Sequence, residues 1–504
     1  MENNLPQGWA WFDMLDVIDY EGGSQPPKKV FIYEPKKGYV RLVQIRDYGD
    51  KPFPTYVPDS PRLKKAKEAD LLIARYGGSS ANDSLGRICS GITGAYNVAL
   101  AKVIFPREYL NTSFIRYLLS GPWFKERLNS LSRSCQTGFN REDLQELFLP
   151  LPPLAEQHRI VAKLDAVMQK VESNKQRLEK IPKLLKRFRQ SVLIAAISGK
   201  LTEDWREKNN KIENAIVLLA RIKQERINKY DIECKQAKKV GLRKPTKPSN
   251  LDDKLLIDAE VEELTPDIPL IWVKVPLATA SANAPNSIVD GPFGSSINVK
   301  TDYIENGIPV VRINNVRPLY FSNNNLKFIS KEKFSELSRH KISSGDILLA
   351  KVGATIGDCC IYPTGLPTAM LSTTGSCRIT VDEEYFDGEF MCYVLCSLKT
   401  VMQQIASEVA QPFLNMATVK NIPVPFCTIE EQKEIVRRVE QLFAFADKIE
   451  ARYTKAKAML DKLPQSILAK AFRGELVPQD PNDEPASVLL ERIKAEKEKL
   501  AEKM

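Results

Sequence analysis

Two long stretches of the chain repeat apolar residues with a spacing of seven. In the first stretch, one set of equivalent positions holds Leu164, Val171, Leu178, Leu185 and Val192. In the second stretch, the corresponding set holds Val439, Ala446, Tyr453, Leu460 and Ile467. A second apolar register lies three residues further along each repeat, and Glu, Lys and Arg fill much of the rest. The pattern predicts two long coiled-coil helices, each roughly 65 Å long for about 45 residues at 1.5 Å per residue.

The two stretches are copies of one another. Glu156-Gln157 recurs as Glu431-Gln432, 275 positions later (431 against 156), and QSVLIAAISGKL (190–201) recurs as QSILAKAFRGEL (465–476) at the same offset. Further along, AIVLLARIK (215–223) is repeated as ASVLLERIK (486–494). The regions before the helices correspond more loosely, as in ADLLIARYGGS (69–79) and GDILLAKVGAT (345–355). The chain therefore has the order module, helix, module, helix.

Prolines and glycines mark the expected irregularities of these helices. Pro182 and Pro464 interrupt the apolar pattern, and because a proline inside a helix kinks or restarts it, we expect a bend at each. Gly199 and Gly474 lie where each helix should end. Asn174 occupies a position that is otherwise apolar, so it either sets the register of the coiled coil or faces water.

The modules mix short β-rich runs with turn residues and one or two helices near their ends, which indicates an α+β fold. We expect two globular domains separated by two long helices that form an antiparallel coiled coil, because that arrangement puts equivalent modules at opposite ends. The expected boundaries are a first module at 1–150, a helical spacer at 151–205, a charged and partly helical linker at 206–262, a second module at 263–425, and a second helical spacer with a C-terminal tail at 426–504.

Charge favours an anionic partner such as nucleic acid. The chain carries 73 Lys and Arg against 63 Asp and Glu, a net charge of +10. Lysine-rich helical surfaces alone also give such an excess. The lysine-rich linker is accordingly either a basic arm that grips DNA or a solvated connection. No apolar run reaches the ~18 residues of a membrane span, and no secretory signal is visible, so a cytoplasmic protein is expected.

The sequence carries no recognisable catalytic centre. It lacks the Asn/Asp-Pro-Pro-Tyr/Phe tetrad of amino-methyltransferases, a glycine-rich S-adenosylmethionine loop, a Walker A lysine, GxSxG and HExxH. Its nine cysteines include no CxxC pair, which favours buried free thiols over disulfides or zinc. Cys392 and Cys396, one helical turn apart, would be the start of any metal site. The chain is interpreted as a recognition protein.

At this point the sequence resembles a known family, the specificity subunits (S, HsdS) of type I restriction–modification systems. The most specific motifs are FNREDLQELFLPLPPLAEQHRIV with LLKRFRQSVLIAAISGKL, and LNMATVKNIPVPFCTIEEQKEIV with LDKLPQSILAKAFRGEL. LPQGWAW, GPFGSS, IPVVRINN and GDILLAKVGATIG agree more weakly. The second copy departs from the family pattern where LPLPPL is replaced by VPFCTI.

The resemblance implies two target-recognition domains, each reading one half of a split sequence in double-stranded DNA. It also implies that the helices form the spacer and dock two methyltransferase subunits, which restriction and translocation subunits join. The chain itself would be non-catalytic and hold no cofactor, while S-adenosylmethionine, ATP and Mg would bind the partner subunits. The alternatives are a fused methyltransferase or nuclease, a coiled-coil scaffold, and a stand-alone DNA-binding protein without a methyltransferase partner.

Polar side chains in the module loops are the candidates for contacting DNA, because hydrogen bonds to base edges read sequence. In the first module they are Ser24, Gln25, Arg46, Tyr48, Arg75, Ser79 and Ser80. In the second module they are Ser295, Ser296, Asn298, Lys300, Arg312, Asn314, Asn315, Lys351 and Thr355. Two further candidates lie in the loops before the helices, Gln136 and Gln411.

Overall fold

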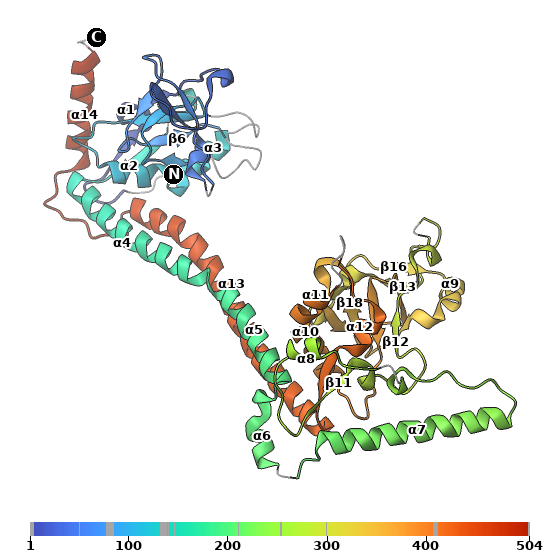
Figure 1. Cartoon of the computed structure of the whole chain (residues 1–504). Coiled ribbons are helices and arrows are strands. Elements are labelled where there is room, and N and C mark those ends of the chain that lie inside the picture. The colour runs from blue at the N-terminus through green and yellow to red at the C-terminus, as the bar shows by residue number, and fades with distance from the viewer. Residues whose placement is uncertain are drawn as a thin grey trace. The chain divides into compact units, whose positions relative to one another are not determined.

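The chain divides into two compact units in a computed structural model (Figure 1). The first unit comprises Met1–Lys180 and Tyr453–Met504, and the second comprises Ile181–Arg452. The structure describes residues 5–49, 51–76, 85–131, 139, 141–145, 147–209, 211–252, 255–298, 300–406 and 412–501. Each unit contains one module together with parts of the long helices.

Two four-stranded sheets and a two-stranded ribbon form the module of the first unit. One sheet is antiparallel, in the order β2 (Asp19–Gly22), β9 (Leu100–Ile104), β6 (Leu72–Ala74) and β7 (Ile88–Cys89). The other has the order β4 (Tyr56–Pro58), β3 (Tyr39–Val43), β8 (Gly94–Tyr96) and β5 (Lys65–Ala66), with β3 parallel to β8. In the ribbon, β1 (Ala10–Asp13) pairs with β10 (Phe148–Leu151).

The module of the second unit repeats every strand of this topology and adds one further ribbon. Its antiparallel sheet has the order β12 (Ile288–Asp290), β21 (Ser376–Ile379), β18 (Ile347–Ala350) and β19 (Cys359–Ile361). Its other sheet has the order β16 (Lys327–Ile329), β13 (Ile308–Val311), β20 (Ala369–Leu371) and β17 (Lys341–Ile342), again with one parallel pair. Two ribbons join β11 (Val273–Pro276) to β22 (Pro423–Phe426), and β14 (Val316–Arg317) to β15 (Tyr320–Phe321). The internal repeat expected from sequence is confirmed.

A pair of helices packs beside the antiparallel sheet in each module. They are α2 (Thr112–Leu119) and α3 (Pro122–Leu131) in the first, and α10 (Gly388–Ser397) and α11 (Lys399–Ile405) in the second. The Asn111 side chain caps α2 by accepting from the N–H of Phe114, and Asp387 caps α10 in the same way. The short helices are α1 (Met14–Val17), α6 (Glu203–Lys208), α8 (Ala259–Glu263), α9 (Lys331–Glu336) and α12 (Met416–Asn421).

The long helices are α4 (Leu154–Leu178), α5 (Ile181–Ile197) and α13 (Ile429–Phe472). In the second unit, Arg189 of α5 forms an ion pair with Asp447 of α13 at 2.6 Å. Asp204, which follows α5 in the chain, pairs with Arg438 of α13. Residue numbers therefore rise along one helix as they fall along its partner, which makes the pair antiparallel. In the first unit, α4 shares a core with the C-terminal end of α13 through Ile160, Leu164, Leu468 and Phe472. The predicted α+β fold with an antiparallel coiled coil is confirmed.

The heptad positions differ in burial along these helices. Buried members are Leu164, Val171, Leu185, Val192, Val439 and Ala446, and half-buried members are Leu178, Tyr453, Leu460 and Ile467. Asn174 is exposed, so it faces water. Three of the buried members, Leu164, Val192 and Val439, belong to the hydrophobic cores that the helices share with the modules.

The glycines and prolines act differently from one another. Gly199 (φ 69°) and Gly474 (φ 74°) adopt the left-handed conformation that ends a helix, as expected. Pro182 is the second residue of α5, after a break in the helix at residues 179–180, where a missing proline N–H costs little. Pro464 lies inside α13, which continues through it. The helix is thus broken just before Pro182, whereas α13 runs without a break through Pro464.

Each long helical segment leads to one more helix that packs on a module. Leu218 and Ile222 of α7 (Ala215–Lys239) enter the second unit's core, and Leu489 and Ile493 of α14 (Ala486–Ala501) enter the first unit's core. The charged linker therefore contains a helix of 25 residues. Among the helices described here, none combines the length and the apolar character that crossing a membrane requires.

Candidate nucleic-acid interface and its anchor to the helices

A buried glutamate joins each module to the start of its long helix. Trp9 donates its indole N–H to Glu156 Oε2 at 2.9 Å, and Trp272 donates to Glu431 Oε2 at the same distance. Both carboxylates are buried. Since each tryptophan lies just before the first ribbon strand of its module, the bond ties that strand to the helix.

The neighbouring glutamine makes the second tie. Gln157 donates to the carbonyl of Pro152 at 3.2 Å, and its side-chain oxygen accepts from the N–H of Asn111, the residue that caps α2. Gln432 does the same with Cys427 at 2.8 Å and with Asp387, the cap of α10. The repeated Glu-Gln pair therefore connects strand, capped helix and long helix in each module.

The partner on the far side of the glutamate differs between the units. In the second unit, Arg206 donates to Glu431 Oε1 at 2.6 Å and to the carbonyl of Gly199 at 2.6 Å. In the first unit, Gln479 donates to Glu156 Oε1 at 3.3 Å and to the carbonyl of Gly474 at 2.7 Å. A guanidinium in one unit and a neutral amide in the other thus donate to the same two acceptors, which are the buried carboxylate and the carbonyl of the glycine that ends a helix.

This difference changes the electrostatics of the first unit. Burial raises the pKa of the Glu156 carboxyl, and the donors Trp9 and Gln479 with the nearby Arg159 offset only part of that rise. Arg159 is itself engaged by Asp483 at 2.5 Å. Glu156 is therefore a buried acid without a dedicated counter-charge.

In the first module, the candidates with exposed side chains are Gln25 and Arg46. Arg46 donates to Thr55 Oγ1 at 2.7 Å and lies over the Phe53 ring at 5.1 Å. Ser24 donates to the carbonyl of Arg62 and is half-buried. These three candidates are available at the surface of loops that flank the strands.

The remaining candidates of this module are less accessible. Tyr48 is half-buried, and burial raises the pKa of its hydroxyl. Arg75 is half-buried, lies 5.8 Å from the centre of the Tyr20 ring, and donates to the carbonyl of Phe139 at 3.4 Å. Three candidates lie outside the described residues: Ser79, Ser80 and Gln136.

In the second module, the exposed candidates are Asn298, Lys300 and Asn314. Asn298 accepts from the N–H of Lys300 at 3.0 Å, so these two share one turn. Ser295 and Ser296 lie in the short helical turn of the glycine-rich loop, Gly294–Ser296. Gln411 lies outside the described residues.

Four polar candidates of the second module are half-buried or buried and bonded within it. Asn315, fully buried, accepts from the N–H of Arg312 at 2.9 Å and donates to the carbonyl of Ser322 at 2.8 Å. Arg312 donates to the carbonyl of Asn325 at 2.6 Å, and Thr355 donates to that of Val352 at 2.9 Å. Lys351 is buried and forms an ion pair with Asp290. In this arrangement, Asn315 and Lys351 hold loops in place.

A hollow of about 550 Å³ beside Lys351 has two aromatic residues on its lining. Phe293, from the glycine-rich loop, is 77% exposed, and Phe413, from the segment before α12, is half exposed. Neither is predicted as a DNA contact from sequence, because hydrogen bonding to bases points to polar side chains alone. The signal available was the motif DGPFGSS itself, which places a large apolar residue between glycines in a loop.

The two modules place equivalent cations at the same backbone site. Arg75 follows β6 and Lys351 follows β18, and their carbonyls accept from the N–H groups of Phe139 at 3.2 Å and Leu414 at 2.9 Å. Phe139 and Leu414 are again 275 positions apart (414 against 139). The segments that precede each long helix are therefore attached to the sheet in the same way.

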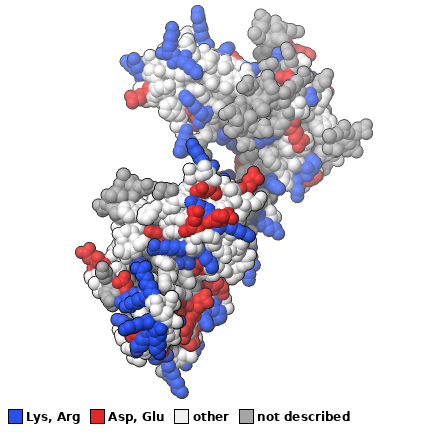
Figure 2. Space-filling model, turned by 90° about the vertical axis from the view of Figure 1, so that its right-hand side faces the viewer, with Lys and Arg blue, Asp and Glu red and all other residues white. Residues whose placement is uncertain are grey.

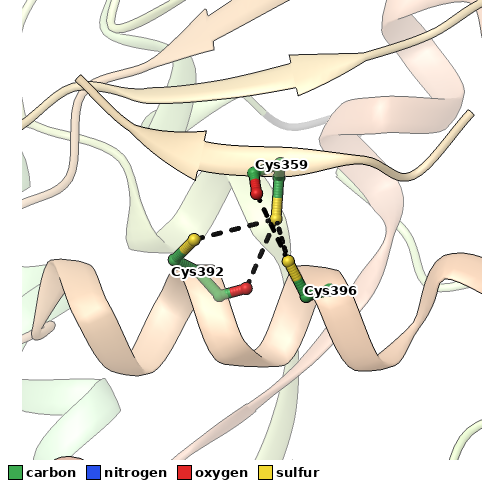
Figure 3. A group of neighbouring side chains, drawn as sticks. All are labelled: Cys359, Cys392 and Cys396. Atoms are coloured by element: carbon green, nitrogen blue, oxygen red, sulfur yellow. Dashed lines mark hydrogen bonds between the residues drawn. The ribbon is translucent and has the colours of Figure 1, made fainter. Parts of the chain in front are cut away.

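Three cysteines bring their sulfur atoms together inside the second module (Figure 3). Cys359 Sγ lies 2.9 Å from Cys396 Sγ and 3.8 Å from Cys392 Sγ, where β19 packs on α10. Burial is the main cause that raises the pKa of the Cys359 thiol. Closed zinc sites use four ligands, and this group contains three thiols. As expected from sequence, most of the described cysteines are buried and all are free thiols.

Comparisons with known proteins agree with this architecture. The family model described as type I restriction modification DNA specificity domain matches residues 6–183 and 293–457. The specificity subunit of the Escherichia coli type I restriction enzyme EcoBI is 31% identical, over 98% of this chain and 93% of that protein. The EcoKI specificity subunit of Escherichia coli strain K12 is 29% identical, over 98% of this chain and 96% of that protein.

Two solved structures share the fold. The HsdS subunit from Thermoanaerobacter tengcongensis matches with a TM-score of 0.54 at 18% identity, over 94% of this chain and 99% of that one. A chain from a structural study of complex assembly and conformational transition in the type I R-M system matches with a TM-score of 0.60, also at 18% identity, over the same shares. With the family model covering more than half of its residues, the chain belongs to the DNA specificity subunits of type I restriction–modification systems.

Proposed function

We propose that this chain directs a type I restriction–modification complex to a bipartite sequence in double-stranded DNA, with each module reading one half. The observation that carries the proposal is the repetition of one module, strand for strand, and of its Glu-Gln anchor on an antiparallel helix pair. Protein repeats suit split sites, because the symmetry of a reader is mirrored in the site it reads. The target-recognition domains are 1–150 and 263–425.

The helical regions 151–205 and 426–504 set the distance between the half-sites and dock two methyltransferase subunits. Their coiled-coil positions supply stiffness, and their solvent-facing sides carry exposed apolar residues such as Leu184, Phe445 and Met459. Large exposed apolar patches mark surfaces that another protein covers, and these side chains are the ones on the helices that a docked methyltransferase subunit would cover. Restriction and translocation subunits join the assembly through these partners.

The chain acts by recognition, and the chemistry belongs to its partners. S-adenosylmethionine, ATP and Mg bind the methyltransferase and restriction subunits. Within this chain, the exposed candidates Gln25, Arg46, Asn298, Lys300 and Asn314 are the first residues assigned to DNA, since each presents a donor or acceptor to solvent. Phe293 joins them as an exposed apolar contact.

A reciprocal half-site experiment tests the proposal. The chain is expressed with its methyltransferase partner, and methylated positions are mapped on genomic DNA. Asn298→Ala with Asn314→Ala should relax or change one half of the target and leave the other half intact. Gln25→Ala with Arg46→Ala should do the opposite, and each pair serves as the control for the other.

Three outcomes would reject this function. If both variant pairs altered the same half, or if the wild-type assembly methylated DNA without sequence preference, the modules would not be separate readers. If the chain failed to bind DNA even with a methyltransferase present, a coiled-coil scaffold would be the better interpretation.

A further inference from the structure

The second half of α7 leaves the core of the second unit and forms a hairpin with the chain that follows it (Figure 1). The last strong anchor of α7 is Arg226, which is buried, pairs with Asp382 at 2.6 Å and donates to the carbonyl of Thr279. The helix continues to Lys239, which at 1.5 Å per residue is roughly 20 Å further. Residues 227–251 are called the basic hairpin below.

Hydrogen bonds hold the chain that follows α7 in place where it turns back along the helix. Gly241, at φ 70°, ends the helix, and the N–H of Leu242 reaches back to the carbonyl of Ala237 at 2.8 Å. Tyr230 of the helix donates its hydroxyl to the carbonyl of Pro245 at 3.1 Å. Asn250 then donates to the carbonyl of Ser281 at 3.0 Å, which fixes the end of the hairpin to the module.

The hairpin carries a large share of the chain's positive charge. Residues 227–251 contain seven lysines and arginines against two acids, Asp231 and Glu233, so their net charge is +5 out of the chain's +10. Between Glu233 and Asp252 no acidic residue occurs. Figure 2 faces the side toward which α7 points, and lysine and arginine side chains gather in the lower part of that view.

Six of these cations have exposed side chains and no acidic partner among the residues that the structure describes: Lys229, Lys235, Lys238, Lys239, Arg243 and Lys244. Lys235, Lys238 and Lys239 share one face of α7, since residues three and four apart are neighbours on a helix. Lys244 lies over the Tyr230 ring at 5.7 Å. Keeping like charges together on a rigid support costs stability, and a polyanion bound there offsets that cost.

We infer that the basic hairpin is a second DNA-binding surface, which holds the phosphate backbone outside the bases that the modules read. The inference rests on the proposed function, which brings the chain onto double-stranded DNA. Contacts to phosphates position a protein on the duplex and carry no sequence information. The hairpin therefore raises affinity for every DNA equally and leaves the choice of target to the modules.

Salt dependence gives the test. In the full chain with its methyltransferase partner, Lys235→Gln, Lys238→Gln, Lys239→Gln and Arg243→Gln are combined, and binding is measured from about 50 to 200 mM salt. Two duplexes are used, one with the mapped target and long flanks, the other unrelated in sequence. Removing one cation that neutralises a phosphate lowers the slope of log affinity against log salt by about 0.9. We expect the slope to fall by about two to four and both affinities to fall by about 10- to 100-fold at the lower salt, with their ratio unchanged.

A variant of opposite sign on the same helix is the matched control. Asp231→Asn with Glu233→Gln removes the two exposed acids and should strengthen binding to both duplexes. Unfolding curves that match the wild type would confirm that neither variant disturbs the fold, since all six side chains are exposed.

Three results would overturn the inference. One is a four-site variant with wild-type affinity and salt slope. Another is a weakening confined to the target duplex, which would make the hairpin a base reader. The third is unchanged DNA binding with loss of the co-purifying methyltransferase, which would make the hairpin, whose tip exposes Val240 and Leu242, a protein contact. A wild-type assembly that did not distinguish the two duplexes would reject the proposed function, independently of the hairpin.

Discussion

The two anchors that join modules to helices use the same glutamate and tryptophan but differ in charge. In the second unit, Glu431 meets the guanidinium of Arg206, while in the first unit Glu156 meets the amide of Gln479. Both partners also hold the carbonyl of a helix-ending glycine. The hydrogen-bond pattern is therefore the part that the two copies share, while the compensation of the buried charge differs between them.

The largest effect is expected when the buried carboxylate of the ionic anchor is removed. Glu431→Ala leaves Arg206, whose side chain is 14% exposed, without its counter-charge, and leaves the Trp272 indole N–H without an acceptor. Breaking a buried ion pair from one side costs about 3–5 kcal/mol. Hydrogen exchange at amides of α10 and β18 measures the local free energy of opening in this unit. An equal or larger loss of stability from Glu156→Ala in the first unit would show that the arginine counter-charge does not make the second anchor the stronger one.

Converting the ionic anchor into the neutral one should cost less. Arg206→Gln keeps a donor for the carbonyl of Gly199 and for Glu431 Oε1 but removes the positive charge. Hydrogen bonds to charged groups contribute about 1.5–3 kcal/mol, and part of this is retained, so a loss of about 1–2 kcal/mol is expected. The same amides of α10 and β18 report it. No loss would mean that the cation adds nothing to the anchor.

The reverse change in the first unit should stabilise it. Gln479→Arg places a cation where Glu156 Oε1 now accepts an amide N–H at 3.3 Å. Gln479 is exposed, so the new charge keeps contact with water and the gain should stay near 1 kcal/mol. Hydrogen exchange at amides of α2 and β6 measures it. Gln479→Lys is the matched control, because lysine adds the charge on a single nitrogen, whereas the arginine fork offers two nitrogens, as Arg206 uses for Glu431 and the carbonyl of Gly199.

Acid dependence separates the two anchors further. Burial raises the pKa of Glu156 above its unfolded value, so the folded first unit favours the protonated carboxyl. This contribution to stability is fully present below the ordinary glutamate pKa of about 4.3 and is lost as the pH rises through the folded value. Glu156→Gln should remove it. The readout is the difference in unfolding free energy between wild type and variant across that window, since other carboxylates titrate in the same range. A difference that grew with rising pH would have the wrong sign.

Much of the fold was accessible from sequence because its signals are periodic. The seven-residue spacing, the two glycines and the 275-residue offset predicted the long helices, their ends and the repeated modules. The anchors were not predictable, because Arg206 and Gln479 lie seven and five residues after their glycines and share no residue type. Their place in polar loops predicts Lys351 and Asn315 as DNA contacts, but both are buried. Lys351 pairs with Asp290, which is distant in sequence, and Asn315 bonds the backbone carbonyl of Ser322, a contact that no side-chain pattern reveals. Phe293 is missed for a different reason, since reading bases by hydrogen bonds points to polar side chains alone.

The smallest effect is expected far from either anchor, at Asn174 in the exposed part of α4. Its side chain faces water, so Asn174→Ala should change stability by no more than about 0.5 kcal/mol, with a slight gain because alanine favours the helix. Unfolding of the first unit in urea measures it. The asparagine could instead hold the register of the helix pair, in which case the alanine variant would change the pairing and broaden the transition. A large loss of stability at Asn174 would mean that contacts in the middle of the helices contribute to joining the modules as well as the two anchors at the helix ends.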